Sequence, residues 1–132
     1  MTFKFINPEH LGPPSGFSNG VLTESGAKWL FIAGQIAGDA EQRIVSDDFV
    51  EQFDRALANV VAVVEAAGGS AAQIARLTIY VTSKAEYRNR TRELGDRYRA
   101  HMGKHFPAMA LVEVKGLLDD RAKVEIEGIA AL

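Results

Sequence analysis

Apolar residues recur at three- and four-residue intervals over residues 49–64, which is the spacing of one buried face of an α-helix. Asp48 and Glu51 are spaced as a capping box at the start of this stretch, and a glycine pair at 68–69 follows it. The pattern therefore predicts a helix of about four to five turns. A second stripe with the same spacing predicts another helix over residues 84–102.

Strands are predicted where apolar and polar residues alternate or where β-branched and apolar residues run together. They are expected near residues 3–6, 21–23, 28–36, 75–82, 108–115 and 124–131. The second and third of these are expected to pair across a short turn. The last two are expected to form another strand pair.

Five consecutive apolar residues, Trp29 to Ala33, indicate a strand that is covered on both faces. The two predicted helices suffice to cover only one face of a small sheet. A second copy of the chain is the economical cover for the other face. We therefore expect self-association.

Two carboxylates, Glu125 and Glu127, alternate with apolar residues in the last strand and so share one face of it. Burying an unpaired carboxylate costs several kcal/mol, so this face is either solvated or functional. In the solvated alternative, Lys115 and Lys123 are the ion-pair partners. The spacing alone leaves both interpretations open.

Composition limits the class of protein. The 132 residues are 47% hydrophobic and 24% charged, as expected for one globular domain over 1–132, and a net charge of -2 favours neither nucleic acid nor membrane as a partner. There is no cysteine, and the first ten residues lack the pattern of a secretory signal, so a cytoplasmic protein is expected. The three histidines do not have metal-ligand spacing, so no metal is expected.

Several short motifs follow one another in a specific order along nearly the whole chain. They are SGFSNG, FIAGQIAGD, QFDRALANVVAVVEAAGGS, LTIYVT, FPAM, VEV and KVEIEGIA. Together they resemble the RidA/YjgF family of reactive-intermediate deaminases. The resemblance implies an α+β, chorismate-mutase-like fold with a mixed sheet of about six strands and two long helices on one face. It also implies a homotrimer with ligand sites in the clefts between subunits, and hydrolysis of enamines or imines without metal or organic cofactor.

The resemblance also implies roles for single residues. In the family, an arginine after the Pro-Ala pair binds the substrate carboxylate, and the first glutamate of the last strand orients the attacking water. The corresponding residues here are Met109 and Glu125. A thioether cannot replace a guanidinium that binds a carboxylate at two points, so activity on imines of amino acids is not expected.

The other residues that the resemblance places at the cleft depart from the family pattern at several points. They are Phe17 in place of a usual tyrosine, Ala33 in place of a typical serine, the matching Gln35, the segment Phe106 and Pro107, and Arg92, a candidate replacement for the missing cation. The changes at 17, 33 and 109 make the site more apolar. They favour a larger or less charged substrate.

Five arginines between residues 88 and 99 suggest nucleic-acid binding at first sight, and the family has at times carried a ribonuclease label. Acidic residues at four-residue spacing, Glu86 with Arg90 and Glu93 with Arg97, indicate a solvated helix face instead. No aromatic residues stand out on that face for stacking on bases. Nucleic acid is not an expected partner.

Three functions of different classes remain. The first is a deaminase or hydrolase of a small enamine, imine or conjugated intermediate, with Glu125 activating water. The second is a non-catalytic trimer that binds a small ligand in the same clefts. The third, a chaperone-like or regulatory protein, rests only on occasional attributions within the family.

Overall fold

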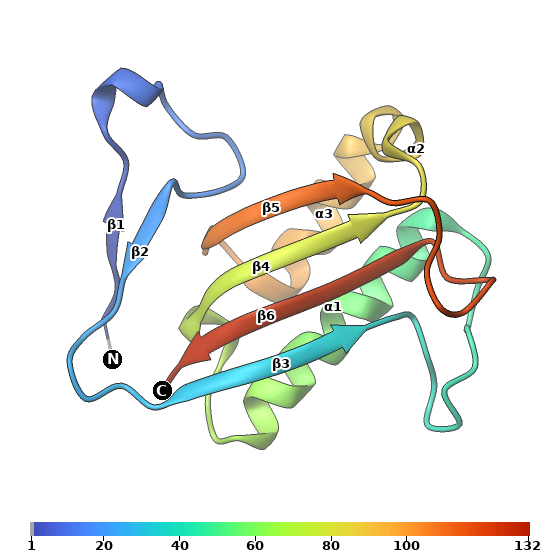
Figure 1. The fold of residues 1–132 in the computed structure, drawn as a ribbon, viewed down its shortest axis with the longest axis horizontal. Coiled ribbons are helices and arrows are strands. Elements are labelled where there is room, and N and C mark those ends of the chain that lie inside the picture. The colour runs from blue at the N-terminus through green and yellow to red at the C-terminus, as the bar shows by residue number, and fades with distance from the viewer. Residues whose placement is uncertain (1) are drawn as a thin grey trace.

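Six strands, three α-helices and two short 3₁₀ helices make up residues 2–132, the part of the chain that the computed structural model describes (Figure 1). In chain order they are β1 (Lys4–Ile6), η1 (Glu9–Leu11), β2 (Gly20–Leu22), β3 (Trp29–Gln35), α1 (Phe49–Ala66), η2 (Ala71–Gln73), β4 (Ile74–Val81), α2 (Lys84–Asn89), α3 (Thr91–Met102), β5 (Ala108–Glu113) and β6 (Val124–Ala131). The predicted α+β class is confirmed. Among these residues, no helix has the length and apolarity needed to cross a bilayer.

Four strands form a mixed sheet in the order β3-β6-β4-β5, in which β4 and β5 run parallel (Figure 1). The other two strands, β1 and β2, pair with each other in a separate hairpin beside this sheet. The expected mixed sheet of about six strands is therefore divided into four and two. At a single point, a bridge between Ser18 and Ala108 links the hairpin segment to β5.

Two predicted strand pairings are wrong. Residues 21–23 do not pair with 28–36, because β2 pairs with β1 in the separate hairpin, and β5 does not pair with β6, because β4 lies between them. Strand β3 pairs with β6 along one edge, and its other edge pairs with no strand within residues 2–132.

The first long helix, α1, begins and ends as predicted. The side chain of Asp48 accepts a hydrogen bond of 3.0 Å from the backbone N–H of Glu51, which satisfies one of the free donors in the first turn. After Ala66 the chain turns through Gly68, whose φ of 88° is readily adopted only by glycine. These local signals position α1 across the sheet.

The second predicted helix is broken at Arg90, so the expected pair of long helices is one long helix and two shorter ones. The guanidinium of Arg90 contacts Asp48 at 2.7 Å and Glu93 at 2.8 Å, and its hydrogen bond lowers the pKa of Asp48. The predicted pairs Glu86 with Arg90 and Glu93 with Arg97 are therefore wrong. Arg97 instead reaches Asp54 of α1 at 3.1 Å, because α3 packs beside α1.

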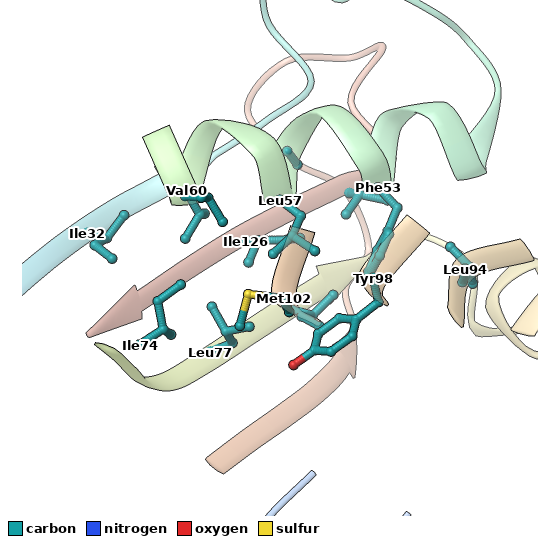
Figure 2. Packing of buried hydrophobic residues seen from close by; sticks show 14 of the residues in the cluster. Ile32, Phe53, Leu57, Val60, Ile74, Leu77, Leu94, Tyr98, Met102 and Ile126 are labelled. Carbon is teal, nitrogen blue, oxygen red and sulfur yellow. The ribbon is translucent and has the colours of Figure 1, made fainter. Parts of the chain in front are cut away.

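One hydrophobic core fills the space between the sheet and the helices α1 and α3 (Figure 2). Leu57 of α1, Leu77 of β4 and Ile126 of β6 have no exposed surface. Burying a side chain of this size stabilises the fold by about 1.5–3 kcal/mol. The core therefore holds the strands in a fixed register, and this register positions the site.

The opposite face of the sheet is open in a single chain. In β3, Ile32 is 4% exposed, whereas Trp29 and Phe31 on the other face are 55% and 74% exposed. One chain therefore covers only one face of β3, whereas the sequence predicts that both faces are covered. Two large aromatic residues in contact with water favour a further layer of protein over this face.

Candidate functional site

A pocket of about 540 Å³ opens where β3 ends and β6 begins, and we call it the Glu125 pocket. It is lined by Gly34, Gln35, Ile36, Gly38, Asp39, Gln42, Asn59, Leu118, Asp119 and Glu125. Its volume lies within the range of about 300–1,000 Å³ that is usual for small-molecule sites. Two predicted site residues, Gln35 and Glu125, thus meet in one pocket.

The predicted common face of the two glutamates is confirmed. Ile126, between them, pairs with Ile79, and both are buried against the helices, so Glu125 and Glu127 lie on the open face of the sheet. Glu127 accepts a hydrogen bond of 3.0 Å from the Tyr80 hydroxyl, and this bond raises the pKa of Tyr80. Within residues 2–132, the carboxylate of Glu125 has no hydrogen-bond or ion-pair partner, so it is available to a ligand.

Eight of the ten residues that line this pocket were not predicted as site residues, Asn59 and Leu118 among them. Asn59 of α1 donates hydrogen bonds to the carbonyls of Ile36 at 3.1 Å and Gly38 at 3.3 Å, which fastens the loop after β3. Leu118, in the loop between β5 and β6, is fully exposed at the rim. The only sequence signal for Asn59 is an amide beside the apolar stripe of α1, and Leu118 has none.

Gly34 provides the space that the Glu125 carboxylate occupies. A Cβ atom on Gly34 would lie 2.9 Å from Cδ and Oε1 of Glu125. The Gly34→Ala variant is therefore expected to displace the carboxylate by about 0.5 Å or more, to restore a contact of about 3.5 Å. A crystal structure of the variant measures this displacement.

The matched control for this substitution is Gly116→Ala, because a Cβ there meets no atom within 4 Å. It should leave Glu125 in place. Since a carboxylate is the movable end of a flexible side chain, both variants are expected to melt within about 2 °C of the unmodified chain. An undisplaced carboxylate in Gly34→Ala would contradict the close packing described here.

Met109 lies on the opposite face of the sheet from Glu125. It pairs in register with Leu77, whose side chain is buried on the helix face. With Phe106 it lines a second pocket of about 500 Å³, which we call the aromatic pocket. The residues that line it are Ser15, Gly16, Phe53, Ile79, Tyr87, Thr91, Leu94, Gly95, Tyr98, Arg99, Phe106 and Met109. One chain alone therefore does not bring Met109 and Glu125 together.

The loop that carries Phe17 is fastened to the start of β5. Ser18 donates a side-chain hydrogen bond of 2.6 Å to the carbonyl of Phe106 and a backbone hydrogen bond of 3.0 Å to that of Pro107. Pro107 is buried, while Phe17 is 38% exposed. The structure thus brings the predicted residues 17, 106 and 107 into one region, beside the aromatic pocket.

The remaining predicted site residues lie outside both pockets. Ala33 is exposed on β3, and its carbonyl accepts a hydrogen bond of 3.2 Å from the side chain of Gln35. Arg92 is exposed on α3, and its proposed replacement of the missing cation stays a prediction. Within residues 2–132, no three His, Cys, Asp or Glu side chains gather in a manner suited to a metal ion.

Residues 9–132 match the family model described as endoribonuclease L-PSP. The chain is similar to a RutC family protein of Pyrococcus abyssi, with 31% identity over 124 residues that cover 93% of this chain and 89% of the relative. It is also similar to 2-iminobutanoate/2-iminopropanoate deaminase of Salmonella typhimurium, with 36% identity over 104 residues, or 76% and 77% of the two chains. Among solved structures, it is similar to YyfB, a Rid family protein of unknown function from Yersinia pestis, with a TM-score of 0.87, 33% identity and coverage of 100% of both chains.

Proposed function

Since the chain belongs to the endoribonuclease L-PSP family, which includes the RidA/YjgF proteins, we propose that it hydrolyses small enamines, imines or related conjugated intermediates. The observation that carries this proposal is the Glu125 carboxylate, unpartnered within residues 2–132 in a pocket open to ligand. Gly34 leaves room for that carboxylate, and Gln35 supplies an amide beside it. The imine chemistry is that named for the Salmonella relative.

In the proposed reaction Glu125 acts as a general base and then as a general acid. It accepts a proton from water while the water oxygen bonds to the imine carbon and the C=N electron pair moves to nitrogen. The proton then passes to nitrogen, which gives a carbinolamine. Glu125 next transfers a second proton from the carbinolamine hydroxyl to nitrogen, the C–N bond breaks, and ammonia leaves as the carbonyl forms. Imine and water thus give carbonyl and ammonia without any change of oxidation state.

Assembly is part of the proposal, because Met109 and Glu125 lie on opposite faces of the sheet in one chain. In a homotrimer, the aromatic pocket of one copy would adjoin the Glu125 pocket of its neighbour. The exposed Trp29 and Phe31 support an assembly that covers the open face of the sheet. A solution mass of one subunit at micromolar concentration would contradict it.

The substrate is expected to lack the carboxylate of 2-aminoacrylate. A guanidinium that binds a carboxylate contributes about 1.5–3 kcal/mol per charge-assisted hydrogen bond, and Met109 makes none. We therefore expect kcat/KM for the imine derived from 2-aminoacrylate to be at least about tenfold lower than for a neutral conjugated imine such as that of acetophenone. A coupled assay of ammonia release measures both.

Two outcomes of this assay contradict the proposal. Rapid hydrolysis of the 2-aminoacrylate imine would show that another cation replaces the family arginine. Binding of imines without any acceleration of ammonia release would favour the alternative, a ligand-binding trimer that has lost the chemistry. The matched variants at Glu125 and Glu127 then test the assigned carboxylate.

A further inference from the structure

The aromatic pocket has a preformed flat wall. The rings of Tyr98 and Phe106 are stacked, with centroids 5.4 Å apart and an angle of 8° between their planes. The Tyr98 hydroxyl donates a hydrogen bond of 2.7 Å to the carbonyl of His105, which holds the ring in place. Leu94, which is buried, also lines the pocket, and Met109 adds a flexible, polarisable surface. Such walls suit a planar, unsaturated ligand.

Apart from Arg99, the polar side chains of the pocket are few and uncharged. The Tyr87 hydroxyl has no hydrogen-bond partner within residues 2–132, and burial raises the pKa of this tyrosine, so it stays a neutral donor at physiological pH. The hydroxyls of Ser15 and Thr91 are two further uncharged polar groups. One hydrogen-bond acceptor on a flat ligand could therefore be satisfied there.

The single cation of the pocket, Arg99, is directed elsewhere. Its guanidinium contacts Asp96 at 2.8 Å and lies over Gly95, where a Cβ atom would meet Nη1 at 3.1 Å. An exposed ion pair of this kind contributes little free energy. A ligand carboxylate that took the place of Asp96 beside Arg99 would therefore also gain little. Among the described residues, Arg99 is therefore the single charge that lines the pocket, and it gives an anion only a weak preference.

We propose that the aromatic pocket binds the flat, uncharged part of the substrate, an aromatic or conjugated group with one hydrogen-bond acceptor, and rejects the corresponding carboxylate. The inference rests on the proposed function only in that the bound ligand is hydrolysed. Binding itself depends only on the pocket. It identifies Tyr87 and Met109 as specificity-determining residues. The substrate class is then imines and enamines of aromatic or conjugated carbonyl compounds.

Benzamide and benzoate test this inference, because they share one ring and differ in charge. Titration calorimetry at pH 7.5 is expected to give a Kd for benzamide at least about tenfold lower than that for benzoate. The Tyr87→Phe variant should weaken benzamide binding by about threefold to tenfold, the usual effect of losing one neutral hydrogen bond. The Met109→Arg variant should reverse the preference between the two ligands. Equal or tighter binding of benzoate to the unmodified chain, or no binding of benzamide at millimolar concentration, would overturn the inference.

Two further variants separate this inference from the proposed function. Glu125→Gln is expected to leave benzamide binding unchanged within about twofold while ammonia release is lost. Selective benzamide binding without hydrolysis of any imine would therefore overturn the proposed function alone. Imine hydrolysis with a preference for benzoate would overturn the inference alone. Arg99→Met tests the cation of the pocket. Weaker benzoate binding in this variant than in the unmodified chain would show that Arg99 favours an anion and would count against the inference.

Discussion

Replacement of Glu125 by glutamine is expected to lower kcat/KM for the preferred imine by about 10²- to 10⁴-fold, the usual contribution of a general acid or base. Glutamine keeps the size of the side chain and one acceptor oxygen, but it cannot accept and return a proton. Because the carboxylate has no partner within residues 2–132, the fold does not depend on its charge. The melting temperature and solution mass should stay unchanged. Steady-state ammonia release gives the rate.

Glu127→Gln is the matched control for this variant. Glu127 lies two residues further along the same face of β6, and its oxygen accepts a hydrogen bond from Tyr80 that glutamine can also accept. Its turnover is expected to stay within about twofold of the unmodified chain. An equal loss in both variants would point to the negative charge of the sheet face, not to proton transfer by Glu125. Full activity in Glu125→Gln would refute the assigned role.

The Leu57→Ala variant is expected to lower the free energy of unfolding by about 3 kcal/mol, within the range of about 2–5 kcal/mol known for buried leucines. Leu57 has no exposed surface and lies between α1 and the sheet (Figure 2). Its loss leaves a cavity that fixed strands cannot close. For a chain of this length, the melting temperature should fall by roughly 10 °C. Denaturant titration at one protein concentration measures the change, since assembly makes stability depend on concentration.

Leu118→Ala is the same chemical change at a fully exposed position, where the side chain is 104% exposed. It is expected to alter the free energy of unfolding by less than about 0.5 kcal/mol. The difference between the two variants isolates the contribution of burial. A loss below about 1 kcal/mol for Leu57→Ala would contradict the packing of α1 against the sheet.

The candidate site shows how far single residues can be inferred from a sequence. The common face of Glu125 and Glu127 follows from strand alternation and is confirmed. The resemblance to the family selects Glu125 and Gln35, and the structure brings both into one pocket. Asn59 and Leu118 line the same pocket from a helix and a loop that are distant in sequence. Nothing in their local sequence marks them, because their role depends on which loop each one contacts.

The break at Arg90 illustrates a limit of periodicity. Apolar spacing predicts one continuous helix over residues 84–102, and the helical region of the structure begins and ends at these residues. The helix is interrupted where Arg90 binds Asp48 at the start of α1. This contact joins residues 42 positions apart, so the spacing of neighbouring residues contains no information about it.

The sequence by itself determined the bounds of α1 and the positions of the strands, because caps, glycines and side-chain periodicity act within a few residues. It indicated the α+β class through its resemblance to a family. Only the tertiary structure decided that β6 pairs with β3, that β4 separates β5 from β6, and that Met109 and Glu125 lie on opposite faces. The physical reason is that strand pairing depends on backbone hydrogen bonds and on burial against distant helices. These energies belong to the assembled core and not to any one segment.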